Sequence, residues 1–151
     1  MSELEYIGNK NLLKLPKTAF LASNTISSET VLRCYDWATE MSRQGRCVVS
    51  GFSSKLEKDV LHFLLKGKQP IIMVLARQMY KAVPTDLKEA LEQNRLLIIS
   101  TSQATRQSRA TALARNRYVC EMADEIMLVG AAEGNSLFEL TEQYKEKIVS
   151  F

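Results

Sequence analysis

The chain has little of what metal sites and disulfide frames require. Its 151 residues include one histidine, His62, and three cysteines, Cys34, Cys47 and Cys120. The cysteines are odd in number, widely spaced and set among apolar neighbours, which favours buried reduced thiols over a disulfide frame or a zinc site. We therefore expect no bound metal. We also expect His62, which lies on a stretch of helical periodicity, to have a packing or surface role and not a catalytic one.

Long apolar runs are missing as well. No stretch approaches the roughly 20 apolar residues that a membrane-spanning helix needs. Glu3, Glu5 and Lys10 occupy the region where a signal peptide would be apolar. We therefore expect a cytoplasmic protein that does not contact a membrane. The content of 46% hydrophobic and 25% charged residues is ordinary for a globular protein, and the length fits one domain.

The glycine-rich motifs of common cofactor sites are also absent. No Gly-x-Gly-x-x-Gly follows the first predicted strand, and no Gly-Lys-Ser/Thr is present to hold a triphosphate. Ser50 follows a predicted strand but lacks the Gly-x-Ser-x-Gly turn that would present it as a nucleophile. We therefore expect no dinucleotide or triphosphate cofactor, and the sequence favours a binding protein over an enzyme.

Acidic residues are missing from one strongly basic segment. Residues 93–120 contain no Asp or Glu and five arginines, Arg95, Arg106, Arg109, Arg115 and Arg117. Clustered guanidinium groups repel one another unless an anion offsets the repulsion, so this arginine block predicts a phosphate-facing surface. The alternative is an ordinary solvated basic face of a helix.

The arrangement of these arginines can be predicted if residues 105–122 form one helix. At the helical repeat, about a third of the circumference would carry Arg106, Arg109, Asn116 and Arg117. Arg115 would then lie on the opposite side.

Short apolar runs alternate with longer amphipathic stretches from Thr18 onward, which predicts parallel strands joined by crossover helices. The predicted strands are 18–22, 47–49, 70–75, 96–99, 125–129 and 148–149. The predicted helices are 29–44, 55–65, 81–93, 105–122 and 136–144. The fold class is therefore α/β, a single doubly wound, mainly parallel sheet with helices on both faces. We expect residues 18–151 to form this domain and residues 1–17, which show no clear element, to form an N-terminal arm.

Three polar loops follow predicted strands, at residues 23–25, 50–54 and 130–136. Ligands of open parallel sheets bind beyond the carboxyl ends of the strands, where helix N-termini present free N–H groups. Helix capping explains any one loop, but three loops beside an arginine block predict an anion site. The candidate nucleic-acid- or phosphate-binding residues are Ser23, Asn24, Ser50, Gly51, Ser53, Ser54, Lys55, Arg106, Arg109, Arg115, Asn116, Arg117, Gly134, Asn135 and Ser136.

Two segments resemble motifs of the DNA-processing protein A (DprA/Smf) family. Residues 48–57, VVSGFSSKLE, look like the family's V-V-S-G-x-A-x-G-I-D, and residues 114–129, ARNRYVCEMADEIMLV, are similar to its R-R-N-R-I-I-A-G-L-S-D-x-V-L-V-V. The stretch 135–137 also resembles a Gly-Ser-Leu that opens the family's next helix. The resemblance covers most of the chain, from Thr18 to the end.

This resemblance implies a Rossmann-like fold, related to that of the LOG nucleotide-processing enzymes, and single-stranded DNA binding in a basic pocket. It further implies a role in DNA processing and recombination, with a recombination protein as partner, and self-association into a homo-oligomer. The family residues that it carries over are Ser50, Gly51, Arg115, Asn116, Arg117 and Ser136. The chain departs from the family where Asn24 replaces an arginine, where Ser54 and Lys55 replace an arginine and a glycine, and where Glu57 replaces an aspartate.

Two other functions remain open. The LOG signature P-G-G-x-G-T-x-x-E, placed on residues 131–139, keeps only Ser136 and Glu139, so we expect Glu139 to be an exposed helix carboxylate. Binding or processing of a small nucleotide is nevertheless one alternative to DNA binding. The other is an interaction domain in which the ancestral site has degenerated.

Overall fold

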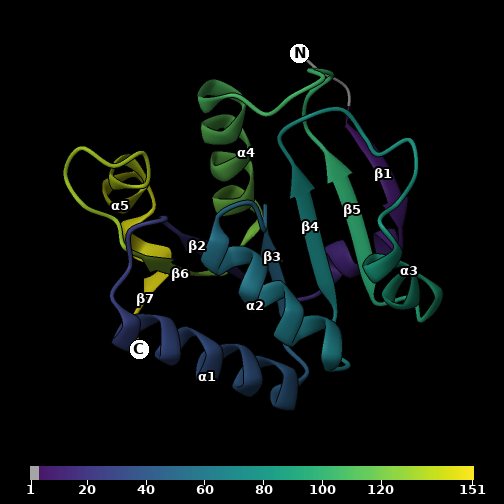
Figure 1. Cartoon of the computed structure of the whole chain (residues 1–151), viewed down its shortest axis with the longest axis horizontal. Helices are drawn as coiled ribbons and strands as arrows, with labels where there is room; N and C mark the ends of the chain where they lie inside the picture. Colours follow the sequence, from purple (N-terminus) through teal and green to yellow (C-terminus); the bar gives the residue numbers. More distant parts are fainter. Residues whose placement is uncertain (1–3) are drawn as a thin grey trace.

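The computed structural model describes residues 4–151 as a seven-stranded sheet with helices on both faces (Figure 1). The strands are β1 (Glu5–Gly8), β2 (Lys17–Ala22), β3 (Cys47–Ser50), β4 (Ile71–Leu75), β5 (Leu96–Ser100), β6 (Glu125–Val129) and β7 (Ile148–Val149). The helices are α1 (Ser28–Gln44), α2 (Lys55–Lys66), α3 (Thr85–Glu92), α4 (Arg109–Met122) and α5 (Phe138–Gln143), with short 3-10 turns η1 (Lys10–Lys14) and η2 (Lys145–Lys147). The strand order is β1-β5-β4-β3-β2-β6-β7, and every pairing except β1 with β5 is parallel. The predicted α/β fold class is confirmed.

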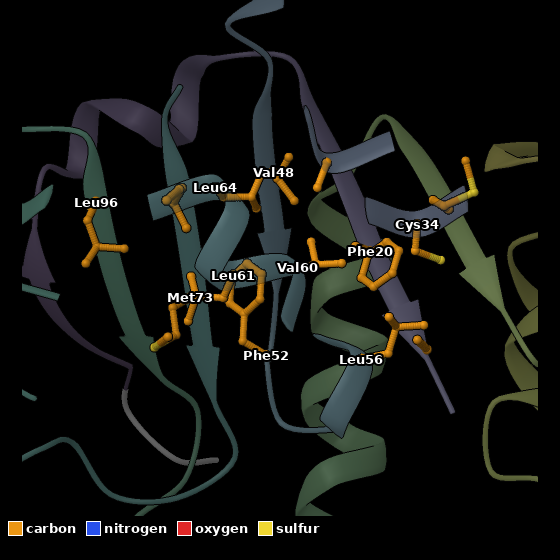
Figure 2. Close-up of a cluster of buried hydrophobic side chains, with 14 of the residues drawn as sticks. Phe20, Cys34, Val48, Phe52, Leu56, Val60, Leu61, Leu64, Met73 and Leu96 are labelled. Carbon is orange, nitrogen blue, oxygen red and sulfur yellow. The ribbon is translucent and has the colours of Figure 1, made fainter. Parts of the chain in front are cut away.

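Both faces of the sheet are covered, which is why its strands are continuous apolar runs. On one face, Phe20 of β2 and Val48 of β3 belong to a cluster with residues of α1 and α2 (Figure 2), which extends to Leu87 of α3. On the other face, the neighbouring residues Leu21 and Val49 pack against α4, α5 and η1. Successive side chains of a strand point to opposite faces, so each strand contributes to both clusters.

The order of the strands places a topological switch point beside β2. From β2 the chain adds β3, β4 and β5 on one side, and α4 then carries it back to β6 on the other side of β2. The connections that leave β2 and β6 therefore diverge to opposite faces, which opens a crevice at the carboxyl ends of the two strands. The arrowheads of β4 and β5 point to the same end of the molecule as the N-terminal turn of α4 (Figure 1).

From Thr18 onward the predicted elements agree with the structure to within two residues at each end, except that α3 begins at Thr85 and not at residue 81, and that α4 also begins later than predicted. The strands at Glu125–Val129 and Ile148–Val149 have the predicted bounds. Helix α4, however, begins at Arg109 and not at residue 105. Ser108 caps it in a reciprocal pair with Thr111, since the Ser108 hydroxyl accepts from the Thr111 N–H at 3.1 Å and Thr111 Oγ1 accepts from the Ser108 N–H at 2.8 Å. Such a pair satisfies two otherwise open donors and sets where the helix starts.

The expectation that the first seventeen residues contain no regular element is wrong. β1 pairs antiparallel with β5, with Glu5 opposite Ser100 and Gly8 opposite Leu97. Leu12 of η1 is buried in the cluster under α4 and α5. The segment therefore extends the sheet by an edge strand and supplies a core residue. Residues 1–3 of the predicted arm lie outside the described residues.

The cysteines and the histidine are placed as predicted. All three thiols are free and buried, and burial raises the pKa of Cys34 to about 11 and the pKa values of Cys47 and Cys120 to about 12. His62 is exposed on α2. Within residues 4–151, no helix is both long and apolar enough to cross a bilayer.

Gly45 is a test of the helix ends predicted from sequence. It follows α1 with a φ of 68°, a left-handed conformation, and its N–H bonds to the carbonyls of Met41 and Ser42. No atom lies near enough to obstruct a side chain, so Gly45→Ala should change only the backbone strain. We expect a loss of about 1 kcal/mol in the free energy of unfolding. Urea denaturation measures this change. The control Gln44→Ala, at the exposed last residue of α1, should change the free energy of unfolding by no more than about 0.5 kcal/mol. Equal changes for the two variants would contradict the left-handed conformation of Gly45.

Candidate nucleic-acid interface

A cavity of about 380 Å³ lies at the carboxyl edge of the sheet, at the switch point between β2 and β6. The loops after β2, β3 and β6 all contribute to its lining, together with α4. The predicted residues that line it are Ser23, Asn24, Ser53, Ser54, Arg115, Asn116, Asn135 and Ser136. The structure thus brings the three polar loops together beside one arginine of the block.

Arg115 is the charged centre of this cavity. It is only 2% exposed, and its guanidinium donates from Nε to Asn116 Oδ1 at 2.8 Å, from Nη1 to the Val74 carbonyl at 3.2 Å and from Nη2 to Ser53 Oγ at 3.0 Å. Burial lowers the pKa of Arg115, and the nearby charge of Glu57 opposes this shift. An arginine side chain nevertheless stays protonated. No carboxylate oxygen of the described residues lies within 4 Å of it, so the cavity holds a cation without a direct ion-pair partner.

Gly51 lies against this arginine, and neither Gly51 nor Ser50 lines the cavity. A methyl group at Gly51 would overlap the guanidinium of Arg115, so only glycine lets the side chain lie against this loop. The fully buried Ser50 hydroxyl accepts from the Phe52 N–H at 3.0 Å. The structure therefore gives these two predicted contact residues a supporting position.

Glu57 is a cavity residue that the sequence analysis did not select. It is 3% exposed; its Oε2 accepts from the Ala22 N–H at 2.9 Å, and its Oε1 accepts from the N–H groups of Ser53 at 2.9 Å and Ser54 at 3.2 Å. The backbone donors that we expected to be open to a phosphate are thus occupied by the protein's own carboxylate. The spacing Ser54-x-x-Glu57 is a capping box, and this signal was available in the sequence.

Polar groups of Asn116 and Ser136 are left for a ligand. Because Asn116 Oδ1 accepts from Arg115, the amide group of Asn116 keeps its N–H donors free. The Ser136 hydroxyl forms no hydrogen bond with the described residues, although Ser136 lines the cavity. Asn135 and Asn24 instead hold loops in place, because Asn135 Oδ1 accepts from the Leu137 N–H at 2.8 Å and Asn24 Oδ1 accepts from the Lys55 N–H at 3.2 Å.

A glycine that the sequence analysis missed brings two of the loops together. Gly130 has a φ of 76°, and a methyl group there would overlap Ile26 and the Ser23 hydroxyl. It therefore allows the loop after β6 to approach the loop after β2. Gly134 has a φ of 87° but open space around it and does not line the cavity. The other lining residues that were not predicted are Ala22, Thr25, Gln107, Ala112 and Leu137.

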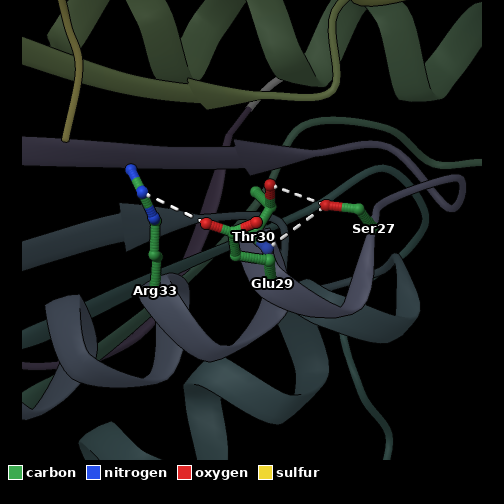
Figure 3. A network of polar contacts seen from close by, with 4 residues as sticks. All are labelled: Ser27, Glu29, Thr30 and Arg33. Atoms are coloured by element: carbon green, nitrogen blue, oxygen red, sulfur yellow. Dashed lines mark hydrogen bonds and ion pairs between the residues drawn. The ribbon is translucent and has the colours of Figure 1, made fainter.

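The loop after β2 closes its own helix terminus. Ser27 Oγ accepts from the Thr30 N–H at 3.3 Å and donates to Thr30 Oγ1 at 2.9 Å, and Arg33 pairs with Glu29 at 3.3 Å (Figure 3). The Ser27 side chain thus takes up one of the backbone N–H groups that the first turn of α1 would otherwise leave without a partner. The donors at this terminus are therefore less available to a ligand than those of Asn116 and Ser136.

The predicted arrangement of the arginines is wrong for Arg106, which is not on the helix, whereas Arg115 is buried apart from the exposed Arg109 and Arg117, as predicted. Arg115 points into the cavity, whereas Arg106 precedes α4 and is exposed, as is Arg109. Neither exposed arginine has an ion-pair partner in residues 4–151, and the first turn of α4 contains no acidic residue. Gln107 lines the cavity, and Arg106 and Arg109 are close to it in sequence without lining the cavity themselves. We call these two residues the mouth arginines.

The remaining basic candidates have partners elsewhere. Arg117 pairs with the exposed Glu139 at 3.3 Å, which confirms Glu139 as an exposed helix carboxylate. Lys55 pairs with Asp59 at 3.6 Å and does not line the cavity. Arg95 is buried at the end of α2, where Nη2 donates to the Leu65 carbonyl at 2.7 Å. A guanidinium at a helix C-terminus complements the helix dipole, so Arg95 has a structural role.

A second hollow, of about 450 Å³, lies between the last turn of α2 and helix α3. Its lining mixes charges of both signs, with Lys66 and Lys68 opposed by Asp86 and Glu89. Arg95 also lines it, so its three cations exceed its two carboxylates, but the hollow lies beside the C-terminal ends of α2 and α3, where the helix dipoles disfavour an anion. We call the two hollows the switch-point cavity and the second hollow.

A model of the DNA recombination-mediator protein A family matches residues 2–140. The chain belongs to this family. The resemblance read from the sequence motifs is therefore confirmed over most of the chain. No curated protein matches the chain.

Solved structures of low sequence identity share the fold of this DNA recombination-mediator protein A family member. DNA processing protein A from Helicobacter pylori, described for its single-stranded DNA binding mode, is 21% identical with a TM-score of 0.74, over 97% of this chain and 70% of that chain. DprA from Streptococcus pneumoniae is 20% identical with a TM-score of 0.78, over 97% of this chain and 54% of that chain. The molybdenum cofactor binding protein of Rippkaea orientalis is 13% identical with a TM-score of 0.60, over 90% and 76%. This chain thus spans about half the length of the Streptococcus protein.

Proposed function

We propose that this chain binds single-stranded DNA at the switch-point cavity and acts in DNA processing and recombination. The observation that carries the proposal is a cavity in which a buried arginine keeps N–H donors free, on a helix whose N-terminal end adds two exposed arginines without ion-pair partners in the described chain. Family membership and the single-stranded DNA binding mode of the Helicobacter pylori protein support it. A recombination protein as partner, self-association and a cytoplasmic location belong to the same proposal.

The number of available arginines predicts the strength of the salt dependence. Each phosphate that a protein neutralises on a single strand contributes about −0.7 to the slope of log K against log salt. The mouth arginines alone therefore predict a slope of about −1.4, and a phosphate that also reaches Arg115 would bring it to about −2. Fluorescence anisotropy of a labelled oligonucleotide at several salt concentrations measures this slope. Absence of salt-dependent binding at low ionic strength would refute the proposal.

Single substitutions can distinguish the contribution of the mouth arginines to DNA binding from that of Arg117. Arg106→Ala and Arg109→Ala should each reduce the magnitude of the slope by about 0.7, because each removes one phosphate contact. Arg117→Ala should leave the slope nearly unchanged, since its charge is already paired with Glu139 outside the cavity. The same anisotropy titrations give both answers. If Arg117→Ala flattens the slope as much as Arg106→Ala does, the mouth has been placed wrongly.

A small nucleotide is the competing ligand, because the switch-point cavity is large enough to hold one. About 380 Å³ lies in the range of small-molecule pockets, roughly 300–1,000 Å³. A free nucleotide that binds there should raise the melting temperature of the protein as its concentration rises. A rise with nucleoside monophosphates that oligonucleotides do not exceed would favour the small ligand over DNA.

A further inference from the structure

We infer that the switch-point cavity receives the uncharged part of one nucleotide, its base and sugar, while the phosphates of the strand stay outside on the mouth arginines. The inference rests on the proposed function and adds which part of the ligand each group binds. It depends on the charges inside the cavity, on the donors left free in it, and on the position of Arg106 and Arg109.

The charges inside the cavity nearly cancel. Arg115 and Glu57 both line it, both are almost completely buried, and they carry opposite charges. A phosphate that entered would be attracted by the guanidinium and repelled by the carboxylate, and it would also lose its hydration. The N–H groups of Ala22, Ser53 and Ser54 cannot offset that loss, because Glu57 already accepts from them. The cavity therefore disfavours a charged phosphate.

The free groups of the cavity instead match a neutral polar ligand. Asn116 retains N–H donors, the Ser136 hydroxyl has no partner among the described residues, and Arg115 uses only part of its N–H fork. Such donors pair with the carbonyl oxygens and ring nitrogens of a nucleobase. No aromatic side chain is among the described lining residues, so hydrogen bonds and not stacking would hold the base.

The mouth arginines are where phosphates can be held without this penalty. Gln107 lines the cavity, while Arg106 and Arg109 on either side of it in sequence are exposed. They lie at the N-terminal end of α4, where the helix dipole adds positive potential and no acidic residue offsets it. When a strand inserts one nucleoside into the cavity, the phosphates on either side of that nucleoside would therefore contact the mouth arginines.

An oligonucleotide without bases tests the inference directly. We would compare a labelled single-stranded oligonucleotide with an abasic strand of the same length and the same number of phosphates. The intact strand should bind about tenfold more tightly, the effect of one or two hydrogen bonds to a base, with the same salt slope near −1.4 for both strands. Equal affinities, or a steeper slope for the intact strand, would overturn the inference. Failure of both strands to bind would instead refute the proposed function.

Two variants show whether the difference arises in the cavity. Ser136→Ala removes an exposed hydroxyl that has no partner among the described residues, so the fold should be unaffected, and it should weaken only the intact strand. Arg106→Ala should weaken the intact and the abasic strands by the same factor, because it removes a phosphate contact. If Ser136→Ala weakens both strands equally, or leaves both unchanged, the base is not held in the cavity.

Discussion

Arg115→Ala is expected to lower the free energy of unfolding by about 3 kcal/mol and to weaken oligonucleotide binding by up to about tenfold. The loss of stability follows because the Val74 carbonyl and Asn116 Oδ1 each lose a buried partner, and Ser53 loses its contact. Binding should fall because the buried cation and its free N–H groups disappear from the cavity. Urea denaturation and anisotropy measure the two effects separately.

Gly51→Ala provides a matched test that keeps the charge. A methyl group at Gly51 overlaps the guanidinium of Arg115 and should force the side chain out of the cavity. Binding should then fall nearly as far as with Arg115→Ala, although the net charge of the protein is unchanged. Circular dichroism shows whether the variant is folded. A folded Gly51→Ala protein that binds the oligonucleotide like the wild type would contradict the position of Arg115.

The second large effect is expected for Glu57→Gln, with a loss of about 2–4 kcal/mol in the free energy of unfolding. The carboxylate accepts on one oxygen from Ala22 and on the other from Ser53 and Ser54. An amide has only one acceptor atom, so either orientation of glutamine places an NH₂ group against a backbone N–H. Since Glu57 joins the loop after β2 to the loop after β3, the cavity should lose its shape as well.

Glu139→Gln is the control for this substitution. It makes the same chemical change at an exposed carboxylate, whose ion pair with Arg117 is a surface contact. Such pairs contribute about 0–1 kcal/mol, so the free energy of unfolding should change little. Thermal or urea denaturation of both variants gives the comparison. A loss for Glu57→Gln no larger than that for Glu139→Gln would show that the three N–H contacts do not hold the loops together.

The sheet could be predicted because its signals are local. The run Leu96–Ile99 is apolar on both faces, which indicates an internal strand, and β5 is indeed covered on both sides. Gly45 ends α1 with the left-handed backbone that glycine favours. β1 gave no such signal, because Glu5–Gly8 is a short edge strand whose stability depends on pairing with β5, about ninety residues away.

The presence of a polar cavity at this edge of the sheet could be predicted, but its internal arrangement could not. The rule that ligands bind at the carboxyl ends of parallel strands was enough to bring the three polar loops together. Helical periodicity gave the angles between the arginines but not which side of α4 faces the sheet. Arg115 turns inward because its partners are Val74 and Ser53, both distant in sequence. An acidic residue in the first turn of a helix can also stay exposed and complement the helix dipole, so the sequence alone did not show that Glu57 points inward.

Chemical-shift mapping with one oligonucleotide tests the location of the interface most directly. Backbone amide signals of the ¹⁵N-labelled protein would be followed as a short single strand is added. We expect the largest shifts around the switch-point cavity, at Asn24, Gln107, Asn116 and Ser136. Shifts concentrated instead at the second hollow, around Lys66 and Lys68, would contradict the account.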